Sequence, residues 1–158
     1  MQQHGEVVNR FLVEVFNEIL KTEEAALAGA HKDLSLRELH LIEEVCRAVD
    51  EERDNRATAI AAAQRVTAGT LTTAVSLLEK KGYLERRRDE RDKRVVRIVP
   101  TAKAREADAR HAKFHEEMVA DILGTLSEEE TAVFVRALGS VAAFFRSGYG
   151  KTMEPDSN

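Results

Sequence analysis

The 158 residues suffice for one domain with a hydrophobic core and are too few for two well-buried domains. Hydrophobic residues make up 43% of the chain and charged residues 33%, which excludes the composition of a disordered protein. The net charge of −4 argues against a protein that coats nucleic acid by bulk attraction, so any contact with DNA must come from a local basic patch.

The first fifty residues predict two helices. Apolar residues recur at spacings of three and four from Val8 to Leu20, which predicts a helix over about 5–28 that Gly29 and a polar turn end. Ser35 with Glu38 three residues later is a capping box, which predicts that a second helix begins there and runs to about residue 49. The charged stretch 50–56 lacks periodicity and is expected to be a loop.

Two shorter helices, a hairpin and two final helices follow. We expect an alanine-rich helix over 59–65 and a helix over about 68–81, capped by Thr67 and ended by Gly82. Segments 83–88 and 94–99 are rich in β-forming residues and flank a charged turn, which predicts a hairpin. Helices over about 101–123 and 127–147 complete a mostly α fold of order α-α-α-α-β-β-α-α with a small β-hairpin wing.

This order predicts a winged helix-turn-helix, whose helix over 68–81 would enter the major groove of double-stranded DNA. Its polar face carries small hydroxyl groups suited to phosphates and base edges, and the hairpin arginines suit the minor groove. The segment 79–94 holds eight basic and five acidic residues. A plain surface helix and a solvated turn are the alternatives. The predicted DNA-binding residues are Thr67, Gly69, Thr70, Thr72, Thr73, Ser76, Lys80, Arg86, Arg87, Arg88, Arg91 and Arg94.

The stretches TAGTLTTAVSLLEKKGYLER (67–86) and DERDKRVVRI (89–98) resemble the MarR family of transcriptional regulators. The resemblance implies a winged-helix homodimer in which Asp92 orders the wing and Arg94 reaches the minor groove or its backbone. Ala104 departs from the family, which usually has glycine there. Segments 35–40, 69–73 and 111–119 are similar to the FabT subgroup of fatty-acid-biosynthesis repressors. That similarity implies repression of lipid-synthesis genes with long-chain acyl-acyl carrier protein as effector.

The first and last helices carry more apolar residues than one small lobe can bury, which favours a homodimer. We therefore expect a helical dimerisation region over 1–32 and 101–150, a DNA-binding lobe over 33–100 and a frayed tail over 151–158. The resemblance implies an apolar effector tunnel near the dimer helices, although apolar stripes are usually only core. The candidates for lining it are Phe16, Ile19, Leu39, Ile42, Phe114 and Met118.

Three histidines suggest an alternative effector. His111 and His115 are one helical turn apart, and His40 lies on a helix expected to pack nearby. With an acid such as Glu23 or Glu24 they would form a tetrahedral zinc site, comparable to that of zinc-responsive members of the MarR family. Alternatively, the histidines only form structural hydrogen bonds. We predict this second possibility, and therefore no metal and no cofactor.

Catalysis has no candidate residues. The chain contains no glycine-rich phosphate loop, no nucleophile elbow and no His-Glu-x-x-His motif, so we predict that it is not an enzyme. Cys46 excludes an intrachain disulfide because it is the only cysteine, and its place on an apolar stripe predicts a buried thiol. The chain lacks an apolar run of about 20 residues and a secretory signal, so we expect a cytoplasmic protein with no membrane partner.

Overall fold

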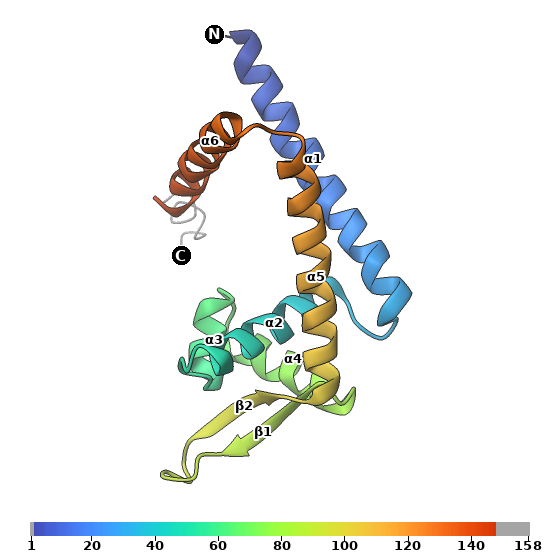
Figure 1. Cartoon of the computed structure of the whole chain (residues 1–158). Helices are drawn as coiled ribbons and strands as arrows, with labels where there is room; N and C mark the ends of the chain where they lie inside the picture. Colours follow the sequence, from blue (N-terminus) through green and yellow to red (C-terminus); the bar gives the residue numbers. More distant parts are fainter. Residues whose placement is uncertain (1, 148–158) are drawn as a thin grey trace, which may run out of the picture. The chain divides into compact units, whose positions relative to one another are not determined.

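A computed structural model of the protein describes residues 2–147 (Figure 1). Its elements confirm the predicted order and the winged-helix fold class. They are α1 (Gln2–Ala30), α2 (Leu36–Asp50), α3 (Ala57–Ala63), α4 (Ala68–Lys80), β1 (Leu84–Arg88), β2 (Val96–Pro100), α5 (Ala102–Gly124) and α6 (Glu128–Arg146). The predicted tail over 151–158 and the last residues of the predicted dimerisation region lie outside the described residues.

Local signals in the sequence begin and end these helices. Ser35 and Ser127 each form a complete capping box, with Glu38 and Glu130 respectively. Gly82 follows α4 with a φ of 80°, a conformation that residues with a Cβ atom rarely adopt. One predicted end was wrong, because Gly29 lies inside α1, which continues to Ala30.

The chain divides between Ala112 and Lys113 into two compact units, which are described separately. The first unit contains the hydrophobic core, formed chiefly by α2 and α4 with the base of the hairpin. Its largest fully buried side chains are Tyr83, Leu39, Ile42, Ile60, Leu71, Leu78, Leu84 and Ile98. In the second unit, α6 has no buried residue and exposes Val133, Val135, Leu138, Phe144 and Phe145. No helix over residues 2–147 combines the length and the apolar character needed to cross a membrane.

The hairpin is antiparallel, and its register pairs Leu84 with Pro100 and Arg88 with Val96. Leu84 and Ile98 are buried against the core, so the base of the hairpin is fixed while its tip projects away from α2 and α4 (Figure 1). The predicted loop 50–56 adds a feature that its sequence did not indicate. Arg56 forms an antiparallel β-bridge with Arg97, so this loop pairs with β2.

Candidate nucleic-acid interface

The N-terminus of α4 is shaped by a threonine cap. Thr67 has an extended backbone, and its Oγ1 accepts a hydrogen bond from the main-chain N–H of Thr70 at 3.1 Å. The two threonine hydroxyls also lie 2.9 Å apart. Both residues are exposed, as are Ala68 and Gly69, so the first turn of α4 is open to a partner.

The core orients the rest of α4. Leu71, Val75 and Leu78 are each at most 1% exposed, and this row of buried residues turns Thr72 and Thr73 toward solvent. The hydroxyls of Thr72 and Thr73 donate to the main-chain oxygens of residues 68 and 69, at 2.8 and 3.1 Å. A hydroxyl that donates in this way keeps its acceptor lone pairs, so both threonines can still accept a hydrogen bond from a base edge.

Arg86 of β1 contacts α4 rather than projecting from the hairpin. Its guanidinium forms an ion pair with Glu79 and donates to Thr72 O and Ser76 Oγ, both at 3.1 Å. Its main-chain N–H also donates to the Glu79 carboxylate at 2.9 Å. Arg86 therefore joins the wing to the predicted recognition helix, and Glu79 offsets the charge of its guanidinium.

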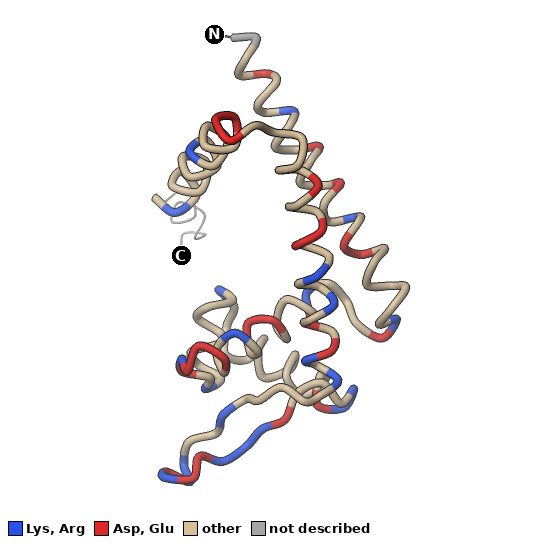
Figure 2. The backbone as a smooth tube through the Cα atoms, viewed as in Figure 1, with Lys and Arg blue, Asp and Glu red and all other residues tan. Residues whose placement is uncertain are grey.

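Other basic side chains of the predicted interface remain available. Arg87 pairs with Glu85 across 2.7 Å, but both side chains are about half exposed or more, so the pair is weak. Figure 2 shows basic residues along the hairpin toward its tip, where acidic residues interrupt them. Within residues 2–147, no ion pair involves the exposed side chains of Lys80, Arg88, Arg91, Lys93 and Arg94.

Two aspartates accept main-chain hydrogen bonds at the tip of the wing. Asp92 Oδ1 accepts a hydrogen bond from the main-chain N–H of Arg94 at 3.0 Å, and its role in ordering the wing stays a prediction. Asp89, which sequence reasoning missed, has more partners. It accepts from the main-chain N–H groups of Arg91 and Asp92 and from Arg97 Nε at 2.5 Å. Asp89 lies two residues before Arg91, a spacing at which an aspartate side chain often accepts a main-chain N–H in a turn. This spacing was the signal available in the sequence.

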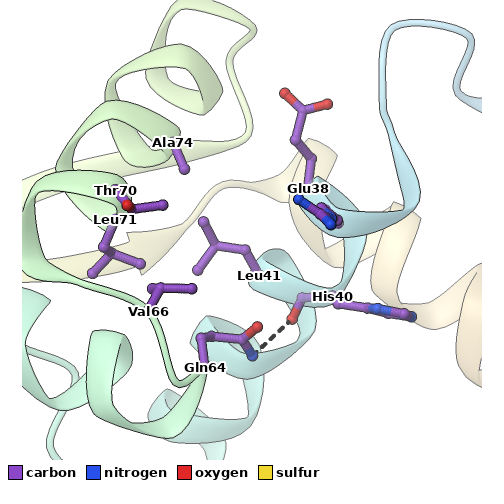
Figure 3. Close-up of a pocket in the computed structure, with 9 residues that line it drawn as sticks. Glu38, His40, Leu41, Gln64, Val66, Thr70, Leu71 and Ala74 are labelled. Atoms are coloured by element: carbon purple, nitrogen blue, oxygen red, sulfur yellow. Dashed lines mark hydrogen bonds between the residues drawn. The ribbon is translucent and has the colours of Figure 1, made fainter. Parts of the chain in front are cut away.

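A cavity of about 410 Å³ lies beside α4 in the first unit (Figure 3). Its walls come from α2, the turn before α4 and α4 itself, and Leu41, Val66, Leu71 and Ala74 point toward one another across it. Gln64 donates weakly to the main-chain oxygen of His40 at 3.5 Å, while the His40 ring points away from the cavity. An occupant of this cavity would touch the same helix that carries the exposed threonines.

None of the six residues predicted to line an effector tunnel lines this cavity. Leu39 and Ile42 belong to the fully buried core, at 2% and 0% exposure. In α1, Ile19 is half-buried and Phe16 is 61% exposed. Phe114 and Met118 belong to the second unit. The tunnel therefore stays a prediction.

A buried histidine lies between two carboxylates in the first unit. His111 Nδ1 lies 2.7 Å from Glu43 Oε1, and His111 Nε2 lies 3.4 Å from Glu23 Oε1. Glu23 and His111 are 5% and 7% exposed, and the His40 ring centroid is 5.7 Å from that of His111. Two of the three predicted histidines thus meet, while His115 belongs to the second unit. Imidazole and carboxylate groups are zinc ligands, so this cluster has suitable chemistry for a metal ion.

Cys46 is confirmed as a buried thiol, with no exposed surface. Burial first, and then the nearby Asp108 carboxylate, raise the pKa of the thiol to about 12. Because the thiolate is the reactive form, native protein at pH 8 is expected to leave Cys46 unmodified by a thiol reagent. Colorimetric thiol titration should detect it only after unfolding in denaturant. Stoichiometric labelling of the native protein would contradict this burial.

Comparisons with known proteins agree with this geometry. The MarR family model matches residues 47–96, which contain the end of α2, then α3, α4 and β1, and the turn of the hairpin up to the first residue of β2. No curated protein matches. Among solved structures, the chain is similar to Streptococcus pneumoniae FabT in complex with DNA, with 37% identity and a TM-score of 0.82. The match covers 89% of this chain and 96% of FabT.

Two more distant structures share the fold. The S. aureus MepR–DNA complex is 18% identical with a TM-score of 0.68, covering 87% of this chain and 95% of MepR. A MarR family protein from Bacillus stearothermophilus is 19% identical with a TM-score of 0.73, covering 93% of this chain and 99% of that one. The 37% identity over 89% of the chain, together with the match to the MarR family model, shows that the chain belongs to the MarR family.

Proposed function

We propose that the protein is a DNA-binding transcriptional regulator that binds an inverted repeat as a homodimer. The observation that carries this proposal is the 37% identity, over 89% of the chain, to a FabT whose structure contains DNA. The exposed threonines of α4 would contact base edges in the major groove, while Arg94 would contact the minor groove. The protein would act as a binding module and not as an enzyme.

Each unit supports the homodimer separately. In the first unit α1 exposes Val8, Phe11 and Phe16, each by more than half. In the second unit Phe144 and Phe145 of α6 are 53% and 61% exposed. Apolar surface on this scale marks an interface in a soluble protein. Two-fold symmetry would place the two recognition helices about one DNA turn, ~34 Å, apart.

We further propose repression of fatty-acid-biosynthesis genes, with a long-chain acyl-acyl carrier protein as effector. The similarity to FabT supports this choice. Mechanistically, the dimer would sample different separations of its two DNA-binding lobes, and the acyl chain would favour one of them. The effector can shift this equilibrium only by as much as its affinities for the two states differ.

The function can be tested by selecting duplexes from a random DNA pool with the purified protein. Enrichment of an inverted repeat that binds one dimer is expected, and recovery of no enriched sequence would overturn the proposal. Fluorescence anisotropy with the selected duplex would then compare palmitoyl-acyl carrier protein with unacylated carrier protein. A change in Kd with the acylated form alone supports the lipid effector, and equal Kd values with both forms exclude it.

A zinc-responsive regulator is the second candidate, favoured by the cluster of His111 with Glu23 and Glu43. Zinc as effector predicts stoichiometric binding in calorimetry and a changed Kd for the selected duplex. His111→Gln should abolish both, whereas the exposed His4 provides a control through His4→Gln. Zinc that binds without altering the Kd would limit the cluster to a structural role.

Gly69→Ala is expected to weaken DNA binding about tenfold, or ~1.4 kcal/mol, without destabilising the protein. A Cβ atom at Gly69 would meet only Thr67 Oγ1, at 4.0 Å, so the folded protein has room for it. The added methyl would instead occupy the space where DNA approaches the first turn of α4. Anisotropy and thermal unfolding would be compared with Gly29→Ala, whose Cβ also meets open space but lies in α1. Unchanged affinity would remove Gly69 from the interface.

Glu79→Gln is expected to tighten DNA binding several-fold, because it releases the Arg86 guanidinium for a phosphate. The slope of log K against log salt concentration should steepen by the amount expected for about one additional phosphate contact. Glu90→Gln is the control, since it also removes one negative charge, but within residues 2–147 Glu90 forms no ion pair with an arginine that the change could release. Weaker binding by Glu79→Gln would show that the ion pair positions the wing instead.

A further inference from the structure

Asn55 is a buried polar residue at the end of the loop that precedes α3. It is 7% exposed, and β2 supplies its partners. Its Nδ2 donates to the main-chain oxygen of Ile98 at 2.9 Å, and its main-chain oxygen accepts from Ile98 N–H at 2.9 Å. Its Oδ1 accepts from Arg97 Nη1 at 3.0 Å. Removing any of these bonds would leave a buried polar group unsatisfied, so Asn55 holds the loop against β2.

Arg97 continues the connection from Asn55 to the tip of the wing. While Nη1 bonds Asn55, Nε donates to Asp89 Oδ2 at 2.5 Å. The other Asp89 oxygen accepts from the main-chain N–H groups of Arg91 and Asp92, at 2.9 and 3.1 Å. Arg97 first, and then these N–H groups, lower the pKa of Asp89 to about 2, so the carboxylate is charged at neutral pH. The guanidinium thus links the loop to the turn that carries the exposed arginines.

The loop itself is anchored to α2. Arg53 N–H donates to the main-chain oxygen of Ala48 at 2.8 Å, and Arg53 Nη1 donates to the buried Glu44 at 3.0 Å. Together with the bridge between Arg56 and Arg97, these contacts form a continuous path from α2 to the tip of the wing. Every residue of this path belongs to the first unit.

An isolated two-stranded hairpin is only marginally stable in water, and its tip would twist freely without further contacts. We propose that Asn55 and Arg97 are positioning residues for DNA binding, which hold the wing so that Arg94 meets the groove. This inference rests on the proposed DNA-binding function. Arg97 would act through its two fixed donors, Nε and Nη1, and not through its charge. A lysine would carry the same charge, but it lacks the planar guanidinium that reaches both partners.

Arg97→Lys is the sharpest test, because it preserves the charge of the hairpin. We expect its Kd for the selected duplex to rise about tenfold, as for Arg97→Gln, whereas Arg110→Gln leaves the Kd nearly unchanged although it also removes a positive charge. Arg110 is the control because it is an exposed arginine of α5 that lies outside the predicted interface. Wild-type affinity of Arg97→Lys would overturn the proposal, because charge alone would then suffice.

A double-mutant cycle with Arg94→Ala tests whether Arg97 acts through Arg94. We expect the effect of Arg97→Lys to vanish in the Arg94→Ala background, and full additivity would overturn the proposed route.

Hydrogen exchange of the DNA-free protein gives a readout independent of function. Peptides over 86–98 should exchange faster in Arg97→Lys, while peptides of α2 stay unchanged. Unaltered exchange would overturn the proposal that Arg97 holds the wing in place. A wild-type protein that binds no duplex would instead refute only the proposed function.

Discussion

Arg94→Ala is expected to weaken DNA binding by about 1–3 kcal/mol, roughly 5- to 150-fold in Kd. Arg94 is exposed at the wing tip, and the Asp92 turn holds its main chain. Within residues 2–147 no carboxylate pairs with its guanidinium, so its charge is available to DNA. Fluorescence anisotropy across a salt series should show that the Kd depends less on salt concentration. The slope of log K against log salt concentration should fall by the amount expected for the loss of about one contact with DNA.

Arg110→Ala is the control for this prediction. Arg110 is an exposed arginine of α5 that pairs loosely with Glu106 at 3.6 Å, outside the wing. Its loss changes the net charge equally, so a general effect of charge would appear in both variants. An Arg94→Ala protein with the same Kd and salt slope as the Arg110→Ala protein would exclude a wing contact with DNA.

Leu78→Ala should lower the free energy of unfolding by about 2–5 kcal/mol. Leu78 has no exposed surface, and it packs the C-terminal half of α4 into the core of the first unit. The shorter side chain would leave a cavity that a close-packed interior cannot fill. Urea denaturation followed by circular dichroism, at one fixed protein concentration because a dimer's stability depends on it, measures the change.

Leu77→Ala is a matched control, since Leu77 is the adjacent residue of the same helix and is 46% exposed. The two variants have the same composition and nearly the same helix propensity, so only burial separates them. Leu77→Ala should alter the free energy of unfolding by less than about 1 kcal/mol. Equal losses for the two leucines would mean that α4 does not pack as described.

Local patterns account for the elements of this fold. The capping boxes at Ser35 and Ser127 begin α2 and α6 because each satisfies helix N–H groups with side chains three residues apart. The spacing of Leu71, Val75 and Leu78 alone identified the buried face of α4, and hence its exposed threonines. Such signals depend on residues close together in the chain, so the sequence by itself determined the element order and the predicted recognition helix.

The tertiary structure decided which polar groups meet. Glu79 and Arg86 are seven residues apart, and Asn55 and Arg97 are forty-two apart. Nothing in the charged loop indicated that Asn55 would be buried, because an asparagine in such a loop is usually solvated. Ion pairs and buried hydrogen bonds between distant residues depend on how helices and strands pack, which the local pattern does not specify. The sequence therefore identified the basic wing, whereas packing determined which of its arginines are paired and which are free for DNA.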